Sequence, residues 1–155
     1  MADHTGAALR RLPVYLLLDC SGSMSGEPIA AMEMGLKTLM GDLRNDPQAL
    51  ETVWLSVITF ASSAEQIIPL TDINDFLPPE LAASGTTALG EAVDLLADRI
   101  RTEVRVTRAD QKGDWKPLVF VLTDGEPTDD WQKSVENFRL RGLATIVACG
   151  AGPGT

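Results

Sequence analysis

The sequence predicts an α/β fold: a doubly wound, mostly parallel sheet with one antiparallel edge strand and helices on both faces. Short continuous apolar runs alternate with longer segments whose apolar residues recur every three or four positions. Only about four residues separate the second apolar run from the third, as in a hairpin. The chain has 155 residues, enough for one domain with a sizeable core.

Five apolar runs are predicted as strands. They are Pro13–Cys20, Val53–Phe60, Glu65–Leu70, Pro117–Thr123 and Leu143–Cys149. The first and fourth runs are continuous, as expected of strands buried on both faces of a parallel sheet. The third run is weaker and contains Pro69, which suits an edge position. Because the hairpin reverses the chain, we expect this third strand to be antiparallel.

Three amphipathic helices are predicted between the strands. They extend from Glu27 to Asn45, from about Ala88 to Val104, and from Thr128 or Asp129 to Gly142. Pro28 suits the first turn of a helix, and Asn45-Asp46-Pro47 is interpreted as the end of the first one. Thr128 or Asp129 can cap the third helix. The acidic pair Asp129-Asp130 is therefore interpreted as a cap and a solvated face rather than a second ion site.

The charge balance excludes some classes of partner. The net charge is −9 and the isoelectric point is about 4.5, which disfavours binding to nucleic acid or to an anionic membrane surface. The first residues lack the apolar core of a signal peptide, and no run approaches the length of a membrane span. We expect a cytoplasmic protein with Cys20 and Cys149 reduced, a flexible tail over residues 1–11 and one domain over 12–155.

Oxygen-bearing side chains follow the predicted strands at one edge of the sheet. Asp19, Ser21 and Ser23 alternate after the first strand, so their side chains can converge on one point. Asp124 follows the fourth strand, and the loop Ser84–Thr87 precedes the second helix. Carboxylates at adjacent strand ends repel each other unless a positive charge lies between them, and these loops contain no lysine or arginine. Hard oxygen ligands suit Mg²⁺, Mn²⁺ or Ca²⁺.

These residues resemble the metal-ion-dependent adhesion site of the von Willebrand factor A domain family. The family pattern is Asp-x-Ser-x-Ser, then a distant Thr, then a distant Asp-Gly. Its counterparts here are Asp19, Ser21, Ser23, Thr87 and Asp124 with Gly125. Thr87 is preferred to Thr86 because residues 85–90 (GTTALG) align best with the family's Gly-Gly-Thr-x-Leu-Gly.

The resemblance covers residues 12–150 and implies a Rossmann-like domain with a divalent metal ion, Mg²⁺ before Mn²⁺ or Ca²⁺. It implies that Ser21, Ser23 and Thr87 contact the metal, while Asp19 and Asp124 act through water molecules. A metal bound mainly by neutral hydroxyls keeps its charge and exchangeable waters, so an Asp or Glu of a partner protein can displace one of them.

The sequence is also similar to that of TerY-type proteins, which are encoded in bacterial tellurite-resistance operons. The similar segments are RRLPVYLLLDCSGSMSGEPI, ALETVWLSVITF and LVFVLTDGEPTDDW. This similarity implies a stress-response module beside a kinase and a phosphatase. Two departures from the family are Cys20, where a threonine or small residue is more usual, and the end of the chain, where the family usually has a further helix and often a strand.

Three other functions are weighed against the residues that each would require. Residues 22–26 (GSMSG) fit the nucleophile motif of esterases, but the only histidine is His4, in the expected tail. A Mg²⁺-dependent phosphatase would need an Asp-x-Asp pair, and Ser21 occupies the second position. A binding module of this kind can also couple to an ATPase of the chelatase type. We expect a binding module that is not an enzyme.

Overall fold

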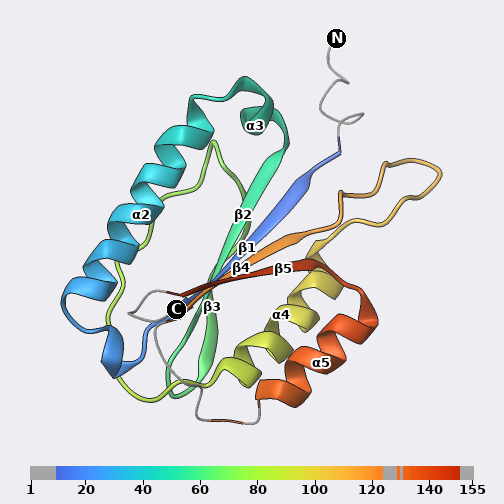
Figure 1. The fold of residues 1–155 in the computed structure, drawn as a ribbon. Coiled ribbons are helices and arrows are strands. Elements are labelled where there is room, and N and C mark those ends of the chain that lie inside the picture. Colours follow the sequence, from blue (N-terminus) through green and yellow to red (C-terminus); the bar gives the residue numbers. More distant parts are fainter. Residues whose placement is uncertain (1–9, 124–128, 130, 151–155) are drawn as a thin grey trace.

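The computed structural model describes residues 10–123, 129 and 131–150, and shows a five-stranded sheet in the order β3-β2-β1-β4-β5 (Figure 1). The strands are β1 (Leu12–Asp19), β2 (Val53–Phe60), β3 (Ala64–Asp72), β4 (Leu118–Thr123) and β5 (Thr145–Gly150). β1 runs parallel to β2 and β4, and β4 runs parallel to β5. Only β3, at the edge, is antiparallel to its neighbour within the described sheet. The predicted strands and the antiparallel edge are therefore confirmed.

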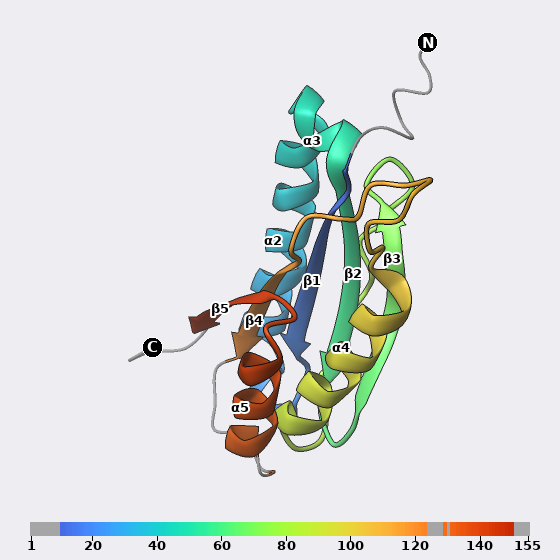
Figure 2. The ribbon, with the colours of Figure 1, turned by 90° about the vertical axis from the view of Figure 1, so that its right-hand side faces the viewer.

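Helices cover both faces of this sheet. They are α2 (Glu27–Arg44), α3 (Pro47–Thr52), α4 (Leu89–Glu103) and α5 (Trp131–Arg141), with a short 3₁₀ turn η1 (Gly22–Met24) before α2. α2 lies on one face, whereas α4 and α5 pack side by side on the other (Figures 1 and 2). The predicted Rossmann-like α/β class is confirmed. None of the helices in the described ranges is both long and apolar enough to cross a membrane.

The alternation of side chains along β1 explains these layers. Leu16 and Leu18 point into the core beneath α2, whereas Tyr15 and Leu17 point into the core beneath α4 and α5. All four side chains are almost fully buried, so β1 is covered on both faces. A strand in this position must be apolar throughout, which accounts for its continuous apolar run.

Helix α3 was not expected from the sequence. Asp46-Pro47 ends α2, but it also begins α3, because the Asp46 carboxylate accepts hydrogen bonds from the backbone N–H groups of Gln48 and Ala49. Pro47 occupies the first turn, where its missing N–H is no loss. The same residues thus act as a stop for one helix and a start for the next.

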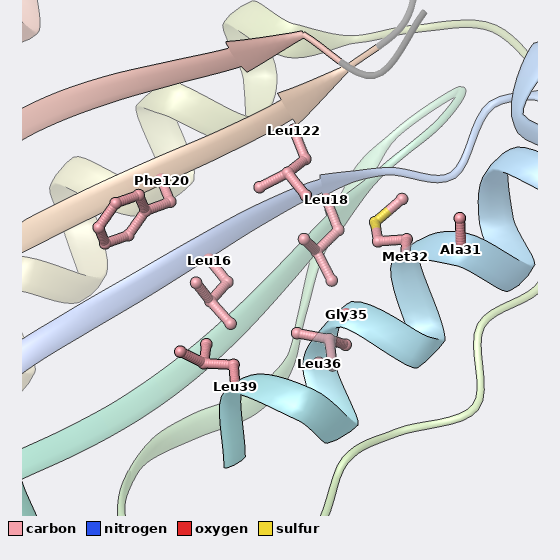
Figure 3. Close-up of a pocket in the computed structure, with 9 residues that line it drawn as sticks. All are labelled: Leu16, Leu18, Ala31, Met32, Gly35, Leu36, Leu39, Phe120 and Leu122. Atoms are coloured by element: carbon pink, nitrogen blue, oxygen red, sulfur yellow. The ribbon is translucent and has the colours of Figure 1, made fainter. Parts of the chain in front are cut away.

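An apolar pocket of about 280 Å³ opens between α2 and the sheet (Figure 3). Its lining comes from β1 (Leu16, Leu18), from β4 (Phe120, Leu122) and from α2 (Ala31, Met32, Gly35, Leu36, Leu39). On the same face of the sheet, Val147 of β5 is 39% exposed. No helix among the described residues covers this part of β4 and β5, in contrast to the opposite face.

A buried ion pair holds the opposite end of the sheet. The Arg11 guanidinium, which also stacks on the Trp54 ring, donates to both carboxylate oxygens of Asp114 at 2.8 and 2.7 Å. The side chains are 12% and 1% exposed. Asp114 also accepts a hydrogen bond from the backbone of Arg105. Arg11, which the sequence placed at the end of a flexible tail, is thus fixed to a loop 103 residues away.

We predict that Asp114→Ala lowers the free energy of unfolding by about 3–5 kcal/mol, because it leaves the buried Arg11 guanidinium without a counterion. The matched control is Asp98→Ala, which breaks the exposed pair with Arg101 and should cost at most about 1 kcal/mol. Urea unfolding of the wild type and both variants measures the difference. Equal losses in the two variants would contradict this role of the ion pair.

Candidate metal site

The carboxylate of Asp19 lies at the end of β1 and is completely buried. Its Oδ1 accepts a hydrogen bond of 2.8 Å from the backbone N–H of Ser21, and its Oδ2 accepts one of 2.7 Å from Thr123 Oγ1. Leu18 pairs with Leu122, so Asp19 and Thr123 lie level at the carboxyl ends of β1 and β4. In a sheet of this strand order, the topological switch point lies between β1 and β4, where ligands bind in such folds.

Two serine hydroxyls lie together directly after Asp19. Ser21 Oγ and Ser23 Oγ are 3.1 Å apart. Ser21 is buried and Ser23 is exposed, so the pair runs from the interior to the surface. Ser21 is the N-cap residue of the turn η1 and Ser23 lies within that turn, so η1 sets the spacing of the two side chains. Asp19 is joined to Ser21 through the backbone N–H, and Ser21 is joined to Ser23 through the two hydroxyls.

The loop before α4 is tied to the same turn by backbone hydrogen bonds. Gly22 N–H donates to Gly85 O, and Ser84 N–H donates to Cys20 O, both at 2.9 Å. Gly85 has a φ of +83°, and a Cβ there would collide with the Ser62 hydroxyl. A glycine is therefore required for the loop to approach this closely.

The structure separates the two threonines that follow Gly85. Thr86 is exposed, and its N–H and hydroxyl both interact with Ser62 Oγ, at 3.2 and 3.5 Å. Thr87 is 6% exposed and lies between Gly85 and Ala88, whose N–H donates to Ala61 O. The backbone on both sides of Thr87 is thus anchored to the end of β1 or of β2.

The remaining predicted residues are distributed as follows. Asp124, with Gly125 and Glu126, lies outside the described residues, as does Asp130. Asp129 was predicted to cap the third helix, α5, and this prediction is wrong. The Asp129 carboxylate accepts hydrogen bonds from the first turn of α4 instead. Thr123, which donates to Asp19, was not predicted as a site residue. Its position at the end of a strand, directly before Asp124, could have indicated it.

Cys20 has no reactive character in this setting. Its side chain is buried, and burial raises the pKa of the thiol to about 11, with smaller contributions from the nearby Asp19 and Glu33 carboxylates. The thiol is therefore protonated near neutral pH and is neither a nucleophile nor a thiolate ligand. The sulfur occupies the α2 side of β1 as an apolar side chain.

The chemistry of these groups fits a hard divalent cation. Neither oxygen of Asp19 is paired with a lysine or arginine in the part of the chain that the structure describes. The neighbouring donors are hydroxyls, and adjacent oxygen ligands of a six-coordinate Mg²⁺ lie about 3 Å apart, close to the Ser21–Ser23 separation. No cluster of three His, Cys, Asp or Glu residues suited to a metal occurs among the described residues.

Known proteins are similar to this chain in family pattern and in fold. The family model of the von Willebrand factor type A domain matches residues 14–154. A search of the curated proteins finds no match. Among solved structures, proximal thread matrix protein 1 of the mussel byssus is 18% identical, with a TM-score of 0.65, and the match covers 92% of this chain and 38% of that one.

Two further solved structures share the fold. The ArnB paralog VWA2 of Sulfolobus acidocaldarius is 18% identical with a TM-score of 0.65, over 93% of this chain and 36% of that one. The manganese-loaded TRAP protein of Plasmodium vivax is 21% identical with a TM-score of 0.59, over 94% of this chain and 59% of that one. The present chain thus spans less than two thirds of each of these three longer chains.

We predict that Gly85→Ala lowers the free energy of unfolding by about 1–3 kcal/mol, because the new Cβ meets Ser62 at a backbone angle that L-residues avoid. The control is Gly41→Ala in α2, where a Cβ has open space and alanine is the better helix former. That variant should gain about 0.5–1 kcal/mol. Chemical unfolding measures both changes, and a gain in Gly85→Ala would show that the close approach is not required.

Proposed function

Because the chain belongs to the von Willebrand factor type A domain family, whose members are typically metal-dependent interaction modules, we propose that it holds a divalent cation at the carboxyl ends of β1 and β4 and thereby binds an acidic side chain of a partner protein. The observation that carries the proposal is the buried Asp19 carboxylate beside the paired hydroxyls of Ser21 and Ser23. This is an arrangement of hard oxygens with no other counterion among the described groups.

In the proposed site, Ser21, Ser23 and Thr87 hold the cation through their hydroxyls, with Asp19 and Asp124 acting through water. When bound, the cation supplies positive charge that attracts a carboxylate. Asp19 orients the Ser21 backbone through Oδ1 and anchors β4 through Oδ2, so the hydroxyls keep their places. Because neutral hydroxyls cancel little of the positive charge, the site retains affinity for a partner's Asp or Glu.

Thr87 is the proposed threonine ligand because Thr86 is already engaged elsewhere. The Thr86 side chain is directed to Ser62 on the β2–β3 hairpin, whereas Thr87 is buried next to the turn that carries Ser21.

Mg²⁺ is the proposed metal, with Mn²⁺ or Ca²⁺ as alternatives. The separation of the two serine hydroxyls supports a small six-coordinate ion. The manganese in the structurally similar TRAP protein supports a site open to divalent ions of similar size.

We also propose a cellular setting, which rests on the resemblance to TerY-type proteins. The module would act in the cytoplasm of a bacterium, in a tellurite-resistance or stress-response system, with a kinase or phosphatase as partner and with no enzymatic activity of its own. Purification of the protein from its native cell, with and without a chelator, tests this setting. Recovery of an ATPase instead would favour a chelatase-type assembly.

We predict that Mg²⁺ raises the midpoint of thermal unfolding of chelator-stripped protein in a saturable manner, because the ion binds only the folded state. The gain should reach about 2.7 kcal/mol at 100 times the dissociation constant. Asp19→Ala and Ser21→Ala should abolish it. Ser21→Ala is the milder change, since it removes one hydroxyl and leaves the hydrogen bonds of Asp19 in place. No gain with Mg²⁺, Mn²⁺ or Ca²⁺ in the wild type would contradict the metal site.

We predict that Thr87→Ala weakens metal affinity more than Thr86→Ala, since only Thr87 faces the site in the proposed arrangement. Calorimetric titration of both variants with Mg²⁺ or Mn²⁺ measures the difference. Thr86→Ala should instead reduce stability slightly through its lost contact with Ser62. A larger loss of affinity in Thr86→Ala would assign the ligand to that residue.

A further inference from the structure

Helix α4 begins without a capping side chain of its own. Its N-cap residue is Ala88, which has no side-chain acceptor for the N–H groups of the first turn. Those groups are nevertheless satisfied: Gly90 N–H donates to Asp129 Oδ1 and Glu91 N–H donates to Asp129 Oδ2, each at 3.0 Å. These are the second and third residues of the helix, the positions that a capping side chain normally serves. Asp129 therefore caps α4 from a segment about forty residues later in the chain.

Gly90 makes this contact possible. A Cβ at Gly90 would lie 3.0 Å from Asp129 Oδ2 and 3.1 Å from the Cα of Trp131, closer than an unstrained packing allows. The start of α4 and the start of α5 lie side by side at the same end of the molecule (Figure 2). The interface is thus built for close approach of the Asp129 carboxylate to the backbone of α4.

The cap acts next to one of the proposed metal ligands. Thr87 directly precedes Ala88, the N-cap residue of α4, so the first turn of α4 fixes the end of the loop that carries Thr87. Because the Asp129 carboxylate binds two N–H groups of that turn, it also holds the α4 end of the Thr87 loop.

We infer that Asp129 is a positioning residue for the metal site, which holds the Thr87 loop in place through the first turn of α4. This inference rests on the proposed function. Because the Asp129 carboxylate binds the N–H groups of Gly90 and Glu91, its effect passes through the backbone of α4. Groups that orient metal ligands from outside the coordination shell typically change metal affinity by about 10–100-fold when they are removed.

The experiment compares Asp129→Ala with Asp46→Ala in the full chain. Asp46 is the matched control because it also accepts two backbone N–H bonds as a helix cap, but at the start of α3, near the opposite end of the sheet. Both variants should lose a similar amount of thermal stability. Calorimetric titration with Mg²⁺ and with Mn²⁺ should show at least a tenfold weaker affinity in Asp129→Ala and a change below twofold in Asp46→Ala.

Hydrogen–deuterium exchange of the metal-free proteins provides a second readout. The amides of Gly90 and Glu91 should exchange faster in Asp129→Ala than in the wild type or in Asp46→Ala. If Asp129→Ala does not fold, Asp129→Asn takes its place, since it keeps one acceptor oxygen, and a smaller loss of affinity is expected.

The outcomes separate this inference from the function on which it rests. Metal binding by the wild type with equal affinities in the Asp129 and Asp46 variants overturns the positioning role and leaves the proposed function standing. Absence of saturable binding by the wild type overturns both. Weaker binding in the Asp129 variant alone, with faster exchange at Gly90 and Glu91, supports the inference.

Discussion

The buried carboxylate of Asp19 holds the site together. A charged group without exposure to water is stable only if its oxygens are well bonded, and here each oxygen accepts one short hydrogen bond. One bond shapes the turn that carries Ser21 and Ser23, and the other joins β1 to Thr123 at the end of β4. The negative charge itself is left without a basic partner among the described residues. The two hydrogen bonds fix the carboxylate in place, so that it links the turn after β1 to the end of β4.

The loops around this carboxylate are fastened mainly through backbone atoms. Gly22 to Gly85, Ser84 to Cys20 and Ala88 to Ala61 are all backbone hydrogen bonds. Side chains are thereby left available for ligands and partners, while the main chain provides rigidity. This division explains why the loop residues at the closest approaches are glycines or small residues: a Cβ at Gly85 would displace Ser62.

The sequence predicted the sheet well because central strands and edge strands have different residue patterns. Continuous apolar runs marked β1 and β4, and Pro69 marked the edge strand β3. It also placed Asp19, Ser21 and Ser23 at the end of β1, where the hydroxyls of Ser21 and Ser23 lie 3.1 Å apart, while their role as metal ligands stays a prediction. Contacts between distant segments left no such pattern. Arg11 with Asp114, Thr123 with Asp19, and Asp129 with α4 each join residues separated by about forty to one hundred positions. Asp129 was predicted to cap the third helix, but its carboxylate caps α4, a helix about forty residues earlier that local sequence could not identify.

The strand order has a consequence for the time course of folding. The β2–β3 hairpin joins neighbours in the chain, whereas the hydrogen bond between Thr123 and Asp19 closes a loop of 104 residues. Loop closure costs more entropy as the loop lengthens, and contacts between distant residues slow folding. The β1–β4 junction is thus among the costliest contacts for the chain to form, and Thr123 reaches Asp19 only when that junction forms. A chain still emerging during synthesis would lack the completed site until β4 had been made and docked.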